Sequence, residues 1–339
     1  MADRSGDGAA GRGLGPAFGL ALAGLILVAG ASLFIGVGEM GLSALLAALT
    51  APEGTDRQAL LLLLASRVPR TLAILFAGMS MGVCAALMQM LVRNRFVEPT
   101  TAGTAEAAGL GLLTVTLLAP GLPVIGKMLA AAAFALAATF LFLKLIDRIA
   151  WRGALMVPLV GLMLGGVIEA LATFIAYRAD LLQSLAAWTT GDFSGVLRGR
   201  YELLWLTVAL AGLAYGVADR FTVAGLGEGF ARNLGLDHAK VVALGLAIVS
   251  LATAACIATA GTVPFLGLIV ANVVGLIMGE NLRRSLPWIA LSGAGFLLVC
   301  DIAGRLVRYP YEIPVGTVAG VVGSAVFLNL LLGRRYRLG

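Results

Sequence analysis

The chain has 339 residues, of which 60% are hydrophobic and only 12% are charged, and its mean hydropathy is +0.98. Soluble domains average closer to half apolar residues, so this composition excludes an ordinary soluble protein. The formal net charge of +6 comes from arginines scattered between apolar runs, which in a membrane protein report topology rather than affinity for nucleic acid.

Long uncharged runs predict membrane-spanning helices. The run between Arg70 and Arg93 is about long enough for a bilayer core of roughly 30 Å, which takes about 20 helical residues. The run between Lys240 and Glu280 holds 39 uncharged residues, which is too long for one span at about 1.5 Å per residue. We expect a break near Gly261–Pro264, because glycine and proline interrupt a helix.

In chain order, residues 1–15 are polar and glycine-rich and predict a flexible tail, and residues 16–335 predict a single transmembrane domain. The predicted spans are ten, at residues 17–37, 68–91, 100–119, 123–145, 153–175, 200–218, 240–260, 263–279, 286–306 and 313–333. An even number places both termini on one side of the membrane. The loops on that side carry 15 of the 24 lysines and arginines, so the positive-inside rule predicts cytoplasmic termini.

Ten spans divide into two sets of five, and an odd number in each set means that related halves would be inverted. Many transporters have this arrangement, with the pathway near the pseudo-twofold axis. We find no strong internal sequence repeat, so the symmetry rests on geometry alone. The predicted fold class is an all-α polytopic membrane protein with about ten transmembrane helices in two inverted halves of five.

Charged residues inside predicted spans are candidate functional residues. Glu106 and Glu169 are two of them, and for each we leave open whether it lines a transport pathway or makes a structural hydrogen bond. Asp301 lies four residues before Arg305, a spacing that favours an intrahelical ion pair.

Two further polar residues, Gln89 and Asn94, lie at the inner end of the second predicted span. Hydrogen bonding between helices and lining of the pathway are both open for them.

The sequence offers no recognisable catalytic, nucleotide or metal site. The patterns G-x-x-x-x-G-K-[ST] and H-E-x-x-H are missing. His238 is the only histidine and lies in a predicted loop without a cluster of metal-ligating side chains. Cys84, Cys256 and Cys300 lie inside apolar runs, as is typical of small buried side chains. We expect no catalytic residue, no metal ligand and no cofactor bound by this chain.

The longest predicted cytoplasmic connection covers residues 219–240. Phe230, Leu234 and Ala231 follow helical spacing there, and Gly227 and Gly235 bound a short helix, with Gly235 as its expected C-terminal stop. A helix of about two turns is marginal alone in water. Two interpretations remain open, a solvated amphipathic connector and an element that docks into a cytoplasmic partner.

Four collinear blocks carry a family resemblance. They are SRVPRTLAILFAGMSMGVCAALMQMLVRNRFVEPTTAGTAEAAGLG (66–111), GEGFARNLGL (227–236), TVPFLGLIVANVVGLIMG (262–279) and DIAGRLVRYPYEIPVGTVAGVVGSAVFLNLLL (301–332). Through them the chain resembles the FecCD family, the permease subunits of iron-siderophore and cobalamin ABC importers. Asn94-Arg95-Phe96 replaces the family's N-P-L, and Ala271-Asn272 replaces its Pro-His. These departures favour the ferric siderophore branch, whose permeases pair with a second, different permease.

The resemblance implies a type II importer fold in the cytoplasmic (inner) membrane, moving a ferric siderophore, with the catecholate type as one candidate. It implies a heterodimer with a second permease, two ATPase subunits that use ATP and Mg, and an extracytoplasmic siderophore-binding protein. The segment that matches the family's coupling helices contains Gly227, Glu228, Phe230, Ala231, Arg232, Leu234 and Gly235.

The resemblance also assigns three outer arginines. In the family, positions that match Arg67, Arg70 and Arg305 face acidic residues of the binding protein, which implies docking. The alternative is that these arginines pair with Asp301 and Glu312 or contact lipid headgroups.

A competing function is an ion-coupled secondary transporter that uses Glu106, Glu169 or Asp301 as proton carriers. An intramembrane enzyme is disfavoured, because no nucleophile with a nearby base is recognisable.

Overall fold

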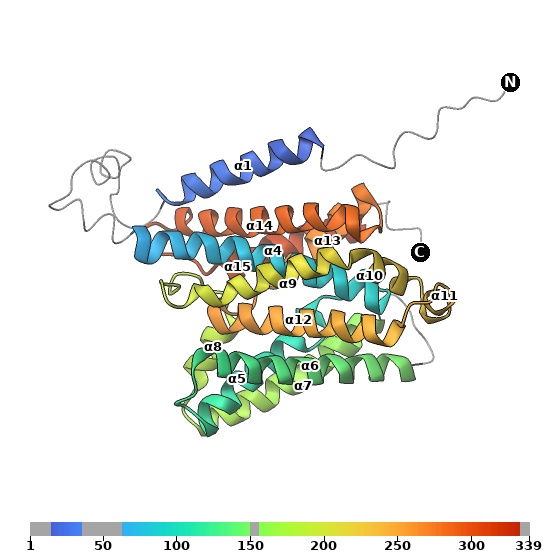
Figure 1. Cartoon of the computed structure of the whole chain (residues 1–339). Coiled ribbons are helices and arrows are strands. Elements are labelled where there is room, and N and C mark those ends of the chain that lie inside the picture. Colours follow the sequence, from blue (N-terminus) through green and yellow to red (C-terminus); the bar gives the residue numbers. More distant parts are fainter. Residues whose placement is uncertain (1–14, 36–62, 150–155, 333–339) are drawn as a thin grey trace.

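The computed structural model describes residues 15–35, 63–149 and 156–332, and every regular element in these ranges is a helix (Figure 1). The helices are α1 (Pro16–Ser32), α4 (Val68–Val92), α5 (Thr104–Leu118), α6 (Val124–Arg148), α7 (Met156–Arg178), α8 (Leu182–Thr189), α9 (Trp205–Gly216), α10 (Ala218–Gly225), α11 (Glu228–Asn233), α12 (His238–Ala260), α13 (Leu266–Met278), α14 (Leu282–Leu306) and α15 (Val315–Leu332). Single turns of π-helix or 3₁₀-helix cover Leu63–Arg67, Pro99–Thr101 and Tyr201–Leu204. The predicted tail lies outside the described residues except for Gly15.

The protein is a multi-pass membrane protein. Five segments are long and apolar enough to cross a membrane, and α9 with α10 would make a sixth span with a 64° bend. Four further apolar helices, α1, α5, α13 and α15, are shorter. Each of the ten predicted spans thus coincides with a helix, although some of these helices begin later than predicted.

The late starts of α5 and α13 have local causes. Before α5, Pro99–Thr101 form a 3₁₀ turn with a capping box, and Gly103 takes a φ of 76° that ends the turn. Before α13, Gly261 has a φ of 89° and Phe265 a φ of 61°. This confirms the predicted break near Gly261–Pro264, because α12 ends at Ala260.

Two series of four helices repeat one pattern of lengths. The helices α4, α5, α6 and α7 have 25, 15, 25 and 23 residues, and α12, α13, α14 and α15 have 23, 13, 25 and 18. In each series a half-length helix follows a long one. The series run in opposite directions, because α4 ends and α12 begins at the end of the molecule that carries α11 (Figure 1). This is the inverted arrangement that the count of spans predicts.

The two series interlock through small residues. Helix α4 packs along α14, and α12 packs along α6. The first helix of each series therefore contacts the third helix of the other series. At the α4–α14 contact, a Cβ on Gly78 would lie 2.4 Å from the carbonyl oxygen of Gly293. Small side chains let membrane helices approach closely enough for dispersion forces to hold them. Helix α4 is accordingly the centre of the molecule, with 78% of its apolar window buried.

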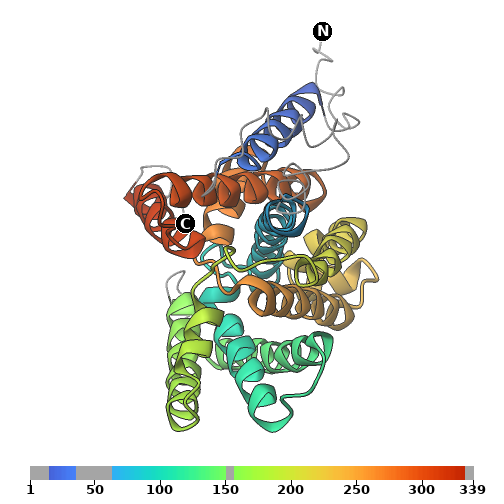
Figure 2. The same ribbon diagram turned by 90° about the vertical axis from the view of Figure 1, so that its left-hand side faces the viewer.

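Helices α7 and α15 lie on one side of the bundle, seen most clearly in Figure 2. Only 22% of the apolar window of α7 is buried. Its outward side chains include Met163, Val167, Phe174 and Tyr177. This side therefore faces either lipid or another membrane subunit.

Candidate functional site

Residues 219–240, which we call the coupling segment, contain most of α10 and all of α11, two short helices at one end of the bundle. In α11, Ala231 is fully buried and Phe230 is 52% exposed, and Leu234, just after the helix, is 62% exposed. Gly227 and Gly235 bound the helix with φ values of 110° and 75°, as the sequence predicts for them. The two large apolar side chains therefore point away from the bundle.

The glycines of this segment lie close to the C-terminal end of α4. A Cβ on Gly225 would lie 2.1 Å from Met90 Sδ, and one on Gly227 would lie 3.2 Å from Arg93 Nη1. Helix α10 thus packs directly on the end of α4.

The charges of the segment are mostly satisfied within it. Glu228 and Arg232 form an exposed ion pair of 2.7 Å on α11. Asp237 caps α12 by accepting a hydrogen bond from the backbone of Lys240, and it pairs with the Lys240 ammonium at 2.9 Å. These contacts hold the pKa of Asp237 below its ordinary value.

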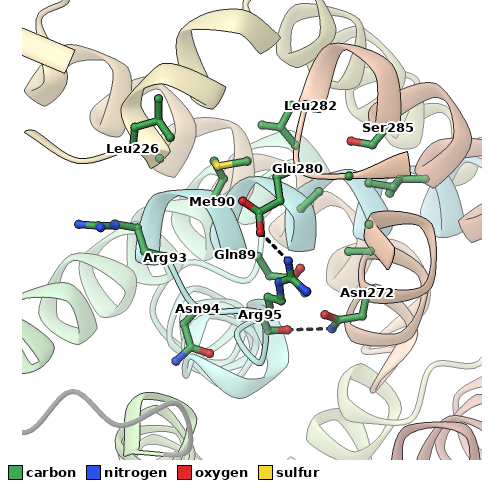
Figure 3. A pocket seen from close by; sticks show the side chains of 16 residues that line it. Gln89, Met90, Arg93, Asn94, Arg95, Leu226, Asn272, Glu280, Leu282 and Ser285 are labelled. Atoms are coloured by element: carbon green, nitrogen blue, oxygen red, sulfur yellow. Dashed lines mark hydrogen bonds and ion pairs between the residues drawn. The ribbon is translucent and has the colours of Figure 1, made fainter. Parts of the chain in front are cut away.

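Beside the segment lies a cavity of about 370 Å³ between the ends of α4 and α13, the start of α14, and α10 (Figure 3). Gln89 and Asn94, which the sequence proposes as pathway residues, both line it. The Gln89 Nε2 atom is buried without a hydrogen-bond partner among the described residues. Asn94 Oδ1 accepts a hydrogen bond of 2.9 Å from the backbone of Phe96. Both residues therefore lie at the C-terminal end of α4, close to the coupling segment.

The structure brings together the two positions at which the chain departs from the family pattern. Asn272 Nδ2 donates to the carbonyl oxygens of Arg95 at 2.8 Å and Leu268 at 2.6 Å. Arg95 in turn pairs with Glu280 at 2.5 Å (Figure 3). The loop after α4 is thus tied to the middle and to the end of α13.

Sequence reasoning missed Glu98, which ties the same loop to the start of α13. Its carboxylate accepts hydrogen bonds from the backbone N–H groups of Phe265 at 3.0 Å and Leu268 at 2.8 Å, and from the Thr100 hydroxyl at 2.7 Å. The residue is 1% exposed. Burial raises the pKa of Glu98, and the hydrogen bonds oppose that effect. The sequence signal was the Glu-Pro-Thr-Thr capping box, which predicts a local cap and not a contact with α13.

Two of the three predicted docking arginines, Arg70 and Arg305, form a network of ion pairs. Arg70 bonds Asp301 at 2.7 Å and Glu312 at 2.6 Å. Arg305 also pairs with Asp301, so the predicted intrahelical pair is confirmed. Asp301 is fully buried and Arg305 is 5% exposed. Arg70 and Arg305 therefore pair with acidic residues of this chain, which was the alternative to docking, and their docking role stays a prediction.

The same arginines attach α1 to the bundle. Arg305 donates to the carbonyl oxygens of Ser32 at 3.0 Å and Ile35 at 2.6 Å. Arg67, which is half-buried, donates to Leu33 O at 2.7 Å. The network thus has a structural function whether or not another protein contacts it.

Glu106 and Glu169 line one cavity of about 340 Å³ between α5, α7 and α8. The Glu106 Oε2 atom is buried and has no hydrogen-bond partner among the described residues. Gly165 of α7 leaves room for this side chain, because a Cβ there would lie 3.3 Å from Glu106 Oε2. The sequence proposed these two residues separately, and the fold places them at one site.

Within the described ranges, no group of three or more His, Cys, Asp or Glu side chains is placed to hold a metal ion. Cys84, Cys256 and Cys300 are free and buried.

Comparison with known proteins agrees with this architecture over nearly the whole chain. The chain is 48% identical over 311 residues to the petrobactin import system permease protein YclN of Bacillus subtilis (strain 168), which covers 92% of this chain and 96% of that protein. It is 41% identical over 277 residues to the ferric-anguibactin transport system permease protein FatD of Vibrio anguillarum (strain ATCC 68554 / 775), covering 82% and 88%.

Among solved structures, a metal-chelate type ABC transporter in an inward-facing conformation has the same fold, with a TM-score of 0.77 at 22% identity over 93% of this chain and 98% of that one. Residues 24–333 match the FecCD transport family. The chain is therefore a member of the FecCD transport family.

Proposed function

We propose that this chain is the membrane-spanning permease subunit of an ATP-driven importer that carries a ferric siderophore into the cytoplasm. The observation that carries the proposal is the near-full-length similarity to permeases of two siderophore systems. The catecholate type is one candidate for the cargo. In this proposal the chain binds no cofactor, and ATP and Mg are used by separate ATPase subunits.

The proposed ATPase contact is the exposed apolar surface of the coupling segment. Leu226, Phe230 and Leu234 are each more than half exposed at the end of the molecule that carries α11. Large apolar side chains that project into water there are favourable only when a partner covers them. Both termini lie on this cytoplasmic side in the proposal.

The proposed second permease, of FecCD type but different in sequence, covers the side formed by α7 and α15. The support is the small buried fraction of α7 and the position of a carboxylate, Glu169, on this side. The binding protein then docks at the opposite end from α11. The docking candidates are Arg67, Arg70 and Arg305, of which Arg70 and Arg305 also pair with acidic residues of this chain.

An ion-coupled secondary transporter is the second candidate function. One observation favours it, namely the buried and unpartnered oxygen of Glu106. Asp301 no longer supports it, because two arginines hold its carboxylate in ion pairs.

The test is uptake by the complete importer in proteoliposomes with ATP inside. We expect uptake of ferric chelates that requires both ATP and the ATPase subunits and that survives a protonophore. Uptake that continues without ATP and stops with the protonophore would establish the ion-coupled function instead.

A further inference from the structure

The starting observation is the position of Glu169. It lies near the middle of α7, a 23-residue apolar helix, and its side chain is exposed on the surface of this subunit. A carboxylate that faced lipid at this depth would be strongly unfavourable. This part of α7 therefore faces water or protein in the assembled importer.

Glu169 also borders the cavity that reaches inward to Glu106. The cavity, which we call the acidic cavity, has a volume of about 340 Å³ and is lined by Glu106, Glu169, Thr173, Thr189 and Thr262 together with small and aliphatic side chains. A shallow hollow on the exposed side of α7 also includes Glu169, together with Thr173 and Tyr177. One carboxylate thus lies at the mouth of the acidic cavity and the other lies deeper.

The described residues supply the acidic cavity with no counter-charge. No lysine, arginine or histidine lines it, and among the described residues neither Glu106 nor Glu169 forms an ion pair. Glu106 lies in the first turn of α5, whose N-terminus supplies only a partial positive charge. A buried carboxylate without a partner is unfavourable, so the orphaned Oε2 atom of Glu106 indicates a missing donor.

The remaining lining indicates what kind of cation fits. The acidic cavity brings only two carboxylates together, and among the described residues no group of three or more His, Cys, Asp or Glu side chains is placed to hold a metal ion. The hydroxyl oxygens of Thr189 and Thr262 donate to the carbonyls of Leu185 and Thr189 at 3.1 and 2.7 Å, which leaves their lone pairs free to accept. Carboxylate and hydroxyl acceptors around a small-residue wall suit an ammonium group, which has only N–H donors to place.

We propose that the acidic cavity binds a protonated amine carried by the transported chelate, and that Glu106 and Glu169 select cargo with such a group. This rests on the proposed importer function and names a substrate feature that the function alone does not require. Glu169 meets the amine first at the open face of α7. Glu106 completes the site with its unpaired oxygen.

The test compares two synthetic ferric catecholate chelates in the reconstituted importer. Both have the same iron-binding groups, and their spacers carry either a protonated secondary amine or an ether oxygen at the same position. The measurement is kcat/KM of ATP-dependent uptake for each chelate. The binding protein is identical in all preparations, so its own preference cancels when each variant is compared with the wild type.

Glu169→Gln and Glu106→Gln should each lower kcat/KM for the amine chelate by about tenfold, the size of a lost hydrogen bond to a charged group. The ether chelate should be unaffected. Asp180→Asn is the matched control, because Asp180 is exposed just beyond α7 and outside the acidic cavity. Glu169→Lys, at an exposed position where folding is not at risk, should exclude the amine chelate and favour one with a carboxylate spacer.

An unchanged ratio between the two chelates in both Gln variants would overturn the proposal, since a carboxyl group that stays protonated is replaced by an amide without loss. Equal losses for both chelates would overturn it as well, by assigning the glutamates a structural role. If the wild-type importer moves neither chelate with ATP present, the importer function itself fails.

Discussion

Three carboxylates inside the bundle lie in three different environments. Asp301 is held by two arginines, Glu98 accepts two backbone N–H groups and a hydroxyl, and Glu106 has one oxygen without a partner in the part of the chain that the structure describes. Paired or hydrogen-bonded carboxylates stabilise the fold around them, whereas an unpaired one weakens it. At the residue scale, this difference separates the structural acids from the candidate binding acid.

Glu98→Ala should destabilise the protein, because it leaves the N–H groups of Phe265 and Leu268 buried without acceptors. We expect a loss of about 3 kcal/mol in the free energy of unfolding. Glu98→Gln keeps one acceptor oxygen and should lose less. The measurement is the unfolding midpoint in mixed detergent micelles, with Asp180→Asn as the exposed control. A Glu98→Ala midpoint equal to that of the wild type would mean that α13 does not depend on this cap.

At the scale of elements, two helix pairs determine how the halves join. Helix α4 contacts α14 through glycines, and α12 contacts α6 through alanines such as Ala131, Ala135 and Ala254. Lipid is as apolar as these surfaces, so close packing rather than the hydrophobic effect holds them together. The loop after α4, anchored by Arg95 and Glu98, then holds α13 in place.

Gly293→Ala tests this packing. Its Cβ would lie 2.3 Å from the carbonyl oxygen of Gly78, and overpacking of this kind costs about 1–3 kcal/mol. On the same helix, a Cβ at Gly295 would meet nothing closer than Leu25 Cδ1 at 3.8 Å. We therefore expect Gly293→Ala to unfold at a lower detergent midpoint while Gly295→Ala does not. If the two variants behave alike, the α4–α14 contact is looser than its geometry indicates.

At the scale of the whole molecule, the two ends of the bundle are built differently. The end opposite α11 has arginines that hold the residues at and just after the end of α1. The end that carries α11 presents the exposed side chains of Phe230 and, just after the helix, Leu234, and it has a cavity of about 370 Å³. Attached chain at one end and exposed apolar side chains at the other suit the ATPase contact that we propose for the α11 end.

Phe230→Asp should abolish binding of the ATPase subunit and ATP-dependent uptake without lowering the unfolding midpoint, because the side chain is 52% exposed. Ala231→Asp is the contrasting variant. Ala231 is fully buried, so its carboxylate should destabilise the segment and lower the midpoint as well as uptake. Co-purification with the ATPase subunit and the two midpoints are the measurements. Normal uptake by Phe230→Asp would show that α11 is a solvated connector.

Within the described residues, the sequence by itself determined the order of the apolar helices, the break before α13 and the short helix between Gly227 and Gly235, because burial in a bilayer and helix-stopping glycines act on local stretches of chain. The pairing of Asp301 with Arg305 was also predictable, since both lie on one helix. Only the tertiary structure decided that Arg70 joins them, that Glu98 caps a helix far along the chain, and that Glu106 shares a cavity with Glu169. Such contacts join helices distant in sequence, and apolar periodicity shows that a helix is buried without showing which neighbour covers it.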